Sequence, residues 1–340
     1  MKSKKVCFFS TSGLEQIKNE QYSLQDVRIL NELGFDVSIA SSFREIPWSC
    51  DLYFSWWASG SVLPFVVSLI RRKPIIVIAG GNEAMFYYDS VSNKTKGYLA
   101  TPWYKKLATK ITLRFSSKIV IVSEFMRKDV MKLGAKNPIL IYNSVDTDKF
   151  IPLKLQRTEI TTIFKLDRDV IELKRGDILL QAIPLILEKY PDQIFTFIGE
   201  FGNGFDEFYA KCKQLGISNN VRFVNNIPNE EVANWMQRSK LYVQISDTET
   251  FGVSIAEALS CETPVVVSRR GAIPEVAGEL GVYVDHNDYI DVAKGIIETL
   301  SKSENELKII RQKMRKRIID NFNYEKRKTE IKRLIDSISD

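Results

Sequence analysis

The chain has 340 residues, of which 44% are hydrophobic and 26% charged, close to the average for soluble globular proteins. This composition excludes a disordered chain and a collagen-like repeat. Four widely spaced cysteines exclude a disulfide scaffold and a zinc ribbon, and a single histidine argues against a His-based metal site or a Ser-His-Asp triad. The net charge is +6, but residues 1–150 carry 21 Lys and Arg against 13 Asp and Glu, and residues 151–300 carry 15 against 22. A basic first half indicates either an anionic partner or an ordinary solvated surface.

Short apolar segments alternate with longer helical patterns along the chain. Continuous apolar strands separated by helices are typical of parallel sheets covered on both faces. The sequence therefore predicts an α/β fold with two doubly wound, Rossmann-like domains. In the first half we expect helices at 17–33, 62–70, 103–115 and 124–133, and strands at 5–9, 36–40, 51–54, 75–79, 118–122 and 139–142. After residue 160 we expect strands at 161–166, 194–198, 221–224, 241–244, 264–267 and 282–284.

Polar segments mark the expected domain boundaries. We predict a first domain at 1–150, a second at 151–320 and a C-terminal helix at 321–340 that packs back on the first domain. Neither a signal peptide nor a membrane span is expected. The apolar run at 6–9 is short, and the run at 56–70 is shorter than the roughly 20 residues that a bilayer requires. We therefore expect a cytoplasmic protein.

Two glutamates flank the start of the helix that follows the strand at 241–244. Glu249 falls in the loop before this helix, and Glu257 lies about 2.2 helical turns further on. Carboxylates accept hydrogen bonds from ribose or sugar hydroxyls. The backbone N–H groups of Gly252 and Val253 at the helix N-terminus suit a phosphate. The alternative is a solvated helix with two surface acids.

This segment and those around it resemble the retaining family-4 glycosyltransferases of the GT-B fold. The resemblance is specific over about 118–285 and weak before residue 75. It implies two Rossmann-like domains facing a cleft, with a nucleotide-sugar donor bound mainly by the second domain and an acceptor mainly by the first. The matching segments are 122–127, 143–150, 197–202, 221–231, 249–257, 263–268 and 271–276.

The resemblance also implies roles for single residues. Glu249 would hold the sugar hydroxyls and Glu257 the ribose. Lys165 and Arg175, with Lys174 as the substitute for Arg175, would neutralise the donor diphosphate, so Glu249, Lys165 and Arg175 form the predicted catalytic set. Further donor-site candidates are Gly199, Asn226, Ile227, Phe251, Gly252 and Val253. Candidates for the acceptor site or cleft are Gly80, Gly81, Asn82, Glu83 and Ser123.

The chain departs from the family pattern in several places. The family often has a histidine after the strand matched by 75–78, where this chain has Gly80, Gly81, Asn82 and Glu83; Asn82 or Glu83 would replace its hydrogen bond. Residues 167–173 form an unusual extra loop. His286 is expected to be structural. The resemblance implies that no metal is required, and the D-x-D triplets at 146–148 and 167–169 are of a kind that is common by chance.

The helix expected at 103–115 is amphipathic, and its cationic pattern includes Lys118 if the helix reaches that residue. Its cations recur every four residues and form one stripe. This stripe would meet either an anionic membrane or only solvent. The stripe comprises Lys106, Lys110, Arg114 and Lys118, and the side chains expected to face inward are Tyr104, Leu107, Ala108, Ile111 and Phe115.

The sequence therefore predicts an enzyme that transfers a sugar from a UDP- or GDP-sugar to a glycan, lipid-linked or other acceptor, with retention of anomeric configuration. No cofactor beyond this donor substrate and no nucleic-acid partner are expected. A peripheral contact of the protein with the inner face of the membrane is kept as an alternative to a purely cytoplasmic location. The main alternative is a non-catalytic nucleotide-sugar-binding protein of the same fold. A nicotinamide dehydrogenase is excluded, because no G-x-G-x-x-G follows the first strand.

Overall fold

The computed structural model describes residues 3–17, 20–89 and 93–339 and divides the chain into two compact units. Unit 1 comprises the chain up to Ser144 together with the segment from Tyr324 onward, and unit 2 is Val145–Asn323. The predicted boundaries, at residues 150 and 320, lie close to these two divisions. The predicted helix at 17–33 is described as two helices, and its residues 18–19 lie outside the described part of the chain.

Unit 1 is a parallel six-stranded sheet in the order β2-β1-β3-β4-β7-β8. Its central strand β4 consists of five buried residues, Ile-Ile-Val-Ile-Ala, as expected for a strand covered on both faces. A separate antiparallel hairpin, β5–β6, was not predicted. The strands are β1 (Lys5–Phe9), β2 (Asp36–Ala40), β3 (Leu52–Trp56), β4 (Ile75–Ala79), β5 (Phe86–Asp89), β6 (Lys94–Gly97), β7 (Lys118–Ile121) and β8 (Ile139–Leu140). The helices are α1 (Leu14–Ile17), α2 (Gln21–Glu32), α3 (Val62–Arg71), α4 (Trp103–Phe115), α5 (Arg127–Lys132) and α14 (Tyr324–Ser339).

The C-terminal helix α14 is tied to unit 1 by a buried ion pair. Arg327 donates two hydrogen bonds to the carboxylate of Asp26 on α2, at 2.7 and 2.8 Å. The indole of Trp56 donates to the same carboxylate at 2.9 Å, and the Arg327 guanidinium also donates to the carbonyl oxygen of Tyr142. This network joins the end of the chain to helix α2 and strand β3, far away in sequence.

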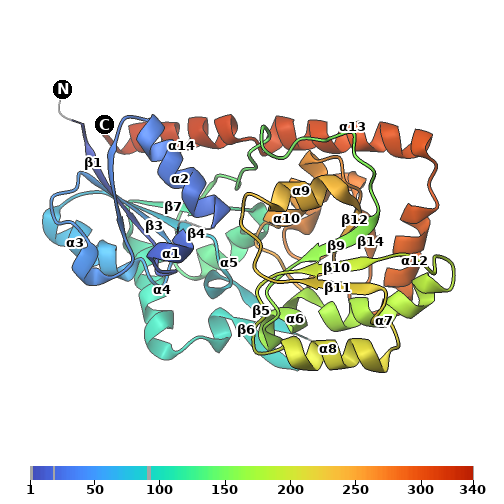
Figure 1. Cartoon of the computed structure of the whole chain (residues 1–340). Coiled ribbons are helices and arrows are strands. Elements are labelled where there is room, and N and C mark those ends of the chain that lie inside the picture. The colour runs from blue at the N-terminus through green and yellow to red at the C-terminus, as the bar shows by residue number, and fades with distance from the viewer. Residues whose placement is uncertain (1–2, 18–19, 90–92, 340) are drawn as a thin grey trace. The chain divides into compact units, whose positions relative to one another are not determined.

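Unit 2 is a second parallel six-stranded sheet, in the order β11-β10-β9-β12-β13-β14. In Figure 1, β9, β10 and β11 run side by side, with α9 on one side and α8 on the other. The strands are β9 (Glu159–Ile163), β10 (Phe195–Ile198), β11 (Val221–Val224), β12 (Ser239–Gln244), β13 (Val265–Ser268) and β14 (Val282–Val284). The helices are α6 (Arg168–Lys174), α7 (Gly176–Leu187), α8 (Phe205–Gln214), α9 (Val232–Arg238), α10 (Val253–Ser260), α11 (Ile273–Ala277), α12 (Tyr289–Leu300) and α13 (Glu304–Asn321).

The strand order of unit 2 reverses between β9 and β12. Successive strands are added on one side of β9, and from β12 onward on the other side. In open α/β sheets, ligands bind at the carboxyl ends of the strands beside such a reversal. The fold therefore directs attention to the loops that follow β9 and β12.

Two local predictions were wrong. Residues 167–173, expected to be a loop, contain most of helix α6, whose first backbone N–H donates to the side chain of Asn203. On α4, the buried residues are Thr109, Thr112 and Leu113, while three of the side chains expected inside are exposed. The hydroxyl of Thr112 donates to the carbonyl oxygen of Ala58 at 2.6 Å, so a polar side chain occupies the inner face. The exposed side chains are Tyr104, Leu107 and Phe115.

Candidate functional site

Glu249 lies at the reversal point of unit 2, in the loop between β12 and α10. Its Oε1 atom accepts hydrogen bonds from the Gln244 amide at 2.6 Å and from the Ser246 hydroxyl at 2.8 Å, and it forms an ion pair with Lys174. Lys174 is the last residue of α6, on the other side of the reversal point. The structure therefore brings together two predicted site residues that are 75 positions apart.

Oε2 of Glu249 has no hydrogen-bond partner among the residues that the structure describes. Three donors hold the other oxygen, so the orientation of the carboxylate is fixed. The Glu249 side chain remains slightly accessible to solvent. One oriented oxygen is thus available for a hydroxyl group of a ligand.

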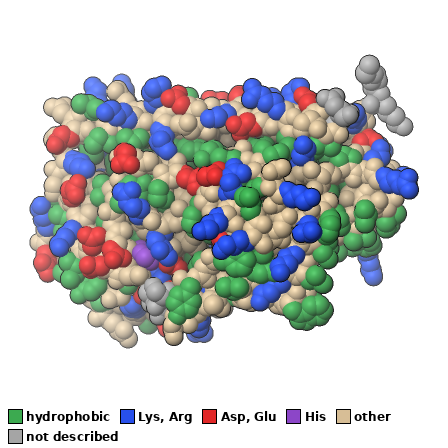
Figure 2. All heavy atoms as spheres, turned by 180° about the vertical axis from the view of Figure 1, so that it is seen from behind, with side chains coloured by type: hydrophobic (Ala, Val, Ile, Leu, Met, Phe, Trp, Pro, Cys, Tyr) green, Lys and Arg blue, Asp and Glu red, His purple; other side chains and the backbone are tan. Residues whose placement is uncertain are grey.

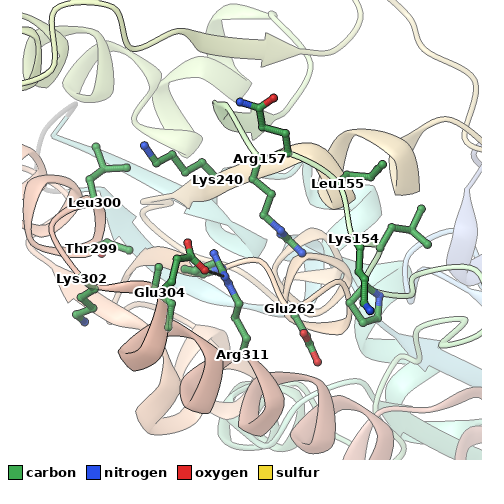
Figure 3. A pocket seen from close by; sticks show the side chains of 15 residues that line it. Lys154, Leu155, Arg157, Lys240, Glu262, Thr299, Leu300, Lys302, Glu304 and Arg311 are labelled. Atoms are coloured by element: carbon green, nitrogen blue, oxygen red, sulfur yellow. Dashed lines mark hydrogen bonds and ion pairs between the residues drawn. The ribbon is translucent and has the colours of Figure 1, made fainter.

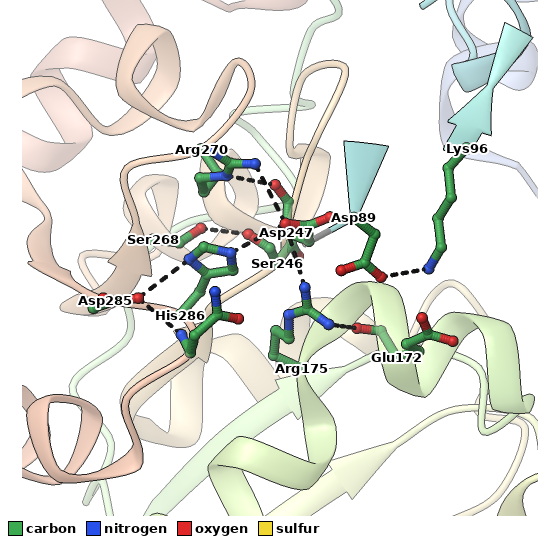
Figure 4. A network of polar contacts seen from close by, with 11 residues as sticks. Asp89, Lys96, Glu172, Arg175, Ser246, Asp247, Ser268, Arg270, Asp285 and His286 are labelled. Atoms are coloured by element: carbon green, nitrogen blue, oxygen red, sulfur yellow. Dashed lines mark hydrogen bonds and ion pairs between the residues drawn. The ribbon is translucent and has the colours of Figure 1, made fainter. Parts of the chain in front are cut away.

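Asp247, two residues before Glu249, holds a buried network that the sequence analysis missed (Figure 4). Its Oδ1 atom lies 3.0 Å from Nε2 of His286 and 3.4 Å from the guanidinium groups of Arg175 and Arg270. The signal was present in the sequence, because Asp247 lies within the segment of Glu249 and Arg270 directly follows an apolar strand. Sequence spacing does not show that these side chains converge.

Arg175, which the sequence analysis assigned to the donor diphosphate, belongs to this buried network. It is 1% exposed, and its guanidinium is directed at Asp247 and at the carbonyl oxygen of Glu172. Arg175 lies between α6 and α7 with a φ of 54°. This left-handed turn directs the side chain of Arg175 away from that of Lys174. Of the two adjacent cations, Lys174 is the one that reaches Glu249.

Lys165, which follows β9, is a partly exposed cation. Its ammonium lies 3.1 Å from the carboxylate of Asp167 and 3.3 Å from that of Glu200. Hydrogen bonds to Asp167 and Glu200 raise the pKa of Lys165. The structure thus pairs Lys165, which the sequence analysis assigned to the diphosphate, with two carboxylates.

Close backbone packing explains two glycines at this edge of the sheet. A Cβ atom on Gly199, directly after β10, would lie 2.0 Å from the carbonyl oxygen of Phe164. Gly271 has a φ of +58°, and a Cβ atom there would lie 2.5 Å from the backbone nitrogen of Glu249. Gly271 therefore allows the Glu249 loop to pack against the end of β13. The candidates Asn226 and Ile227 follow β11, where Asn226 is exposed and Ile227 partly so.

Helix α10 begins beside Glu249 without a side-chain cap. Gly252 is its N-cap residue, and Val253 is the first residue of the helix. The ring of Phe251 is buried and packs edge-on against Phe322 at 5.5 Å, so this predicted donor-site residue anchors the turn through its side chain. Unbonded N–H groups at a helix start favour an anion.

Glu257 lies inside α10 and is 5% exposed. Burial raises the pKa of Glu257 to about 8, and the positive charge of Lys149 opposes this shift. The carboxyl group is therefore largely protonated at neutral pH. A neutral carboxyl group can both donate and accept a hydrogen bond, and a hydroxyl group can take either role.

The candidates of unit 1 lie at the carboxyl ends of the adjacent strands β4 and β7. Gly80 and Gly81 pack against the rings of Trp56 and Trp57. Asn82 and Glu83 follow in a short 3-10 turn; Glu83 accepts a hydrogen bond from the backbone N–H of Ala58 at 3.0 Å, and burial raises its pKa. After β7, the buried hydroxyl of Ser123 has no hydrogen-bond partner among the described residues.

A hollow of about 800 Å³ lies at the opposite edge of the unit 2 sheet (Figure 3). Its lining includes Lys240 at the start of β12, Pro264 just before β13 and Arg157 just before β9. Arg157 donates to the carbonyl oxygens of Ser239 and Cys261 and so joins the starts of these strands. The lining contains none of the predicted site residues.

Within residues 3–17, 20–89 and 93–339, no group of three or more His, Cys, Asp and Glu side chains is arranged to hold a metal ion. No helix in this part of the chain is both long and apolar enough to cross a membrane.

Comparisons with known proteins relate the chain to glycosyltransferases. The sequence model of a family described as "Glycosyl transferases group 1" matches residues 149–321. The GPI3 subunit of phosphatidylinositol N-acetylglucosaminyltransferase from Saccharomyces cerevisiae is 25% identical over 263 residues, which are 69% of this chain and 57% of that protein. The D-inositol 3-phosphate glycosyltransferase of Corynebacterium jeikeium is 32% identical over 132 residues, 36% of this chain and 32% of that protein. The chain thus spans little more than half the length of its GPI3 relatives.

Solved structures are similar over nearly the whole chain. Anabaena HepE, solved in complex with UDP and glucose, has a TM-score of 0.80 at 16% identity, covering 98% of this chain and 100% of that one. Sucrose-phosphate synthase from Thermosynechococcus elongatus has a TM-score of 0.76 at 15% identity, covering 98% and 99%. Identities this low show the fold alone. The predicted GT-B fold, with two Rossmann-like parallel-sheet units, is confirmed.

Proposed function

Because the chain belongs to the group 1 glycosyltransferases, we propose that it transfers a sugar from a nucleoside diphosphate sugar to a glycan or lipid-linked acceptor, with retention of anomeric configuration. The observation that carries the proposal is the Glu249–Lys174 pair beside the uncapped start of α10. It combines a carboxylate for sugar hydroxyls with a cation and backbone donors for a diphosphate. The solved complex of Anabaena HepE with UDP and glucose supports this choice of donor.

In this proposal the donor lies at the carboxyl edge of the unit 2 sheet. Oε2 of Glu249 accepts a sugar hydroxyl, and Lys174 and the first N–H groups of α10 hold the diphosphate. Lys165 supplies a second cation after exchanging its pairing with Asp167 or Glu200 for the phosphate. The ribose bonds to the carboxyl group of Glu257. Positive groups fixed around the leaving diphosphate stabilise the charge that develops on it during transfer.

Arg175 has a positioning role in this account. Its guanidinium and that of Arg270 compensate the buried charge of Asp247. Oδ1 of Asp247 is hydrogen-bonded to Nε2 of His286. The backbone N–H of Asp247 donates to the carbonyl oxygen of Leu173 at 2.8 Å. This hydrogen bond ties the end of α6 to the Glu249 loop. We therefore propose Lys174 rather than Arg175 as the cation that contacts the diphosphate.

The acceptor would bind to unit 1, at the ends of β4 and β7. Gly80 and Gly81 would let it approach the backbone. Asn82 and Glu83 would offer it hydrogen bonds, and the unpartnered hydroxyl of Ser123 would do the same. We also propose that the enzyme works in the cytoplasm and reaches a lipid-linked acceptor by peripheral contact with the membrane.

Replacing Lys174 tests the diphosphate site. Lys174→Ala should weaken binding of UDP or GDP by tenfold or more, because a charge-assisted hydrogen bond contributes about 1.5–3 kcal/mol and about 1.4 kcal/mol is tenfold. Affinity for the corresponding nucleoside should not change. Titration calorimetry with both ligands measures the difference, with Lys211→Ala, on α8, as the matched control. Equal affinity of Lys174→Ala and wild type for the diphosphate would exclude this role.

A non-catalytic nucleotide-sugar-binding protein is the second candidate. Gly80 and Gly81 stand where the family often has a histidine, and this departure favours the second candidate. Hydrolysis or transfer of a radiolabelled UDP- or GDP-sugar separates the two functions, because a binding protein would bind the donor without consuming it.

A further inference from the structure

Two neighbouring helices of unit 1 present large apolar side chains to solvent. On α4, Trp103 and Phe115 are 76% and 62% exposed. On α3, which packs against α4, Leu69 and Ile70 are 67% and 60% exposed. Contiguous exposed apolar side chains mark an interaction site more often than isolated ones do. We name this surface the α3–α4 face; its apolar members are Leu69, Ile70, Trp103, Tyr104, Leu107 and Phe115.

The α3–α4 face is also basic and lacks acidic residues. Residues 52–82 and 93–123, which contain the two helices, include no Asp or Glu. Within the described residues, none of the six cations of the face forms an ion pair. At the lower right of the view in Figure 2, hydrophobic and basic side chains are intermixed, with few acidic ones. The six cations are Arg71, Arg72, Lys105, Lys106, Lys110 and Arg114.

The inner side of α4 explains why these apolar groups stay outside. The hydroxyl of Thr112 donates to the carbonyl oxygen of Ala58, and that of Thr109 donates to the carbonyl oxygen of Lys105. These two hydrogen-bonded side chains and the apolar side chain of Leu113 are the buried side chains of α4. Rotating the helix to bury Leu107 or Phe115 would break the bond to Ala58. The exposure is therefore built into the packing of unit 1.

We infer that the α3–α4 face is the surface through which this protein lies on an anionic lipid bilayer. Helices that bind in the plane of a membrane combine Trp, Phe and Leu with Lys and Arg. The apolar side chains enter the boundary between headgroups and acyl chains, and the basic side chains bind anionic headgroups. The inference rests on the proposed membrane contact but not on the transfer reaction, because α3 and α4 contain no candidate donor- or acceptor-site residue.

The mixture of side chains favours lipid over other anions. A polynucleotide would engage the six cations, but it would leave Leu69, Ile70 and Leu107 in contact with water. A bilayer satisfies both kinds of side chain at once. Lipid binding should therefore keep an apolar component at salt concentrations that screen surface charges, since the Debye length falls to about 3 Å at 1 M.

Vesicle flotation of the full chain tests the surface. Wild type should float with vesicles that contain phosphatidylglycerol and bind at least tenfold less to phosphatidylcholine alone. Lys106→Glu/Lys110→Glu/Arg114→Glu should reduce binding to the anionic vesicles by tenfold or more. Lys308→Glu/Lys313→Glu/Lys316→Glu makes the same change of charge on α13 and should bind like wild type.

A second pair of variants tests the apolar part. Leu107→Ser/Phe115→Ser should lose the binding that survives high salt, whereas Ile309→Ser/Ile319→Ser, which removes two exposed apolar side chains from α13, should retain it. Brominated lipids should quench the fluorescence of Trp103, and Trp103→Phe should remove that quenching.

Hydrolysis of the nucleotide-sugar donor in solution should be equal in all these variants. Loss of donor hydrolysis would therefore concern the proposed chemistry and not this surface. No binding of wild type to anionic vesicles, equal binding by the face variants and the controls, or binding to a polynucleotide alone would overturn the inference.

Discussion

Asp247 and Glu249 are two residues apart in one loop, yet their carboxylates have different surroundings. Asp247 is buried among Arg175, Arg270 and His286, whereas Glu249 keeps one oriented oxygen available. The sequence predicted that Glu249 and one of the adjacent cations Lys174 and Arg175 belong to the donor site. It could not predict which of the two cations turns toward which acid, because a turn with positive φ decides that direction.

The titration of Glu257 gives a prediction at this scale. Burial raises its pKa to about 8, so the protonated group stabilises the folded state fully below about pH 4.5, and this contribution is lost as the pH rises through about 8. The free energy of unfolding of wild type should therefore fall, relative to that of Glu257→Gln, between pH 5 and 8, by at most about 1.4 kcal/mol per pH unit. Urea unfolding at several pH values measures the difference.

Glu207→Gln is the control for this titration, because Glu207 is an exposed carboxylate of the same unit. Its pH profile should run parallel to that of wild type. If the profile of Glu257→Gln also runs parallel to wild type, Glu257 titrates normally and its proposed neutral form is wrong.

At the scale of elements, the apolar strands and the motif around Glu249 were predictable, and the helix faces were not. Continuous apolar strands such as β4 carry a strong signal, because both of their faces are buried. On α4 the signal failed, because Thr109 and Thr112 satisfy their hydroxyls within the helix and against Ala58. Helix α6 was missed because it has only seven residues, four of them charged, which is too short for a helical pattern of apolar residues to stand out.

The docking of α14 gives a prediction at the scale of elements. Removing one partner of a buried ion pair leaves an uncompensated charge and costs about 3–5 kcal/mol. Arg327→Met should therefore destabilise unit 1 by this order and expose α14 to proteolysis. Limited proteolysis with mass spectrometry detects cleavage within 324–339.

The exposed pair between Lys332 and Asp336 on the same helix provides a control, because Lys332→Met should have almost no effect. Resistance of Arg327→Met to proteolysis equal to that of wild type would show that the ion pair does not hold α14.

At the scale of the whole chain, the alternation of strands and helices predicted two parallel-sheet units. The strand orders could be inferred only through the family resemblance, since periodicity does not show which strands are neighbours. Candidates distant in sequence, such as Lys174 and Glu249, meet because the parallel strands of unit 2 place their carboxyl ends at one edge. The network of Asp247 depends on side-chain directions, which no sequence pattern encodes.

Replacing Glu249 tests the central claim most directly, because its proposed contact is with the sugar and not with the nucleotide. Glu249→Gln should reduce transfer by at least tenfold, since about 1.36 kcal/mol lost in the transition state is tenfold in rate. Affinity for the free nucleoside diphosphate should not fall, because that ligand lacks the sugar. Steady-state transfer and calorimetry on the same variant give both values. Turnover at the wild-type level, or a loss of nucleotide affinity as large as the loss of turnover, would contradict the account.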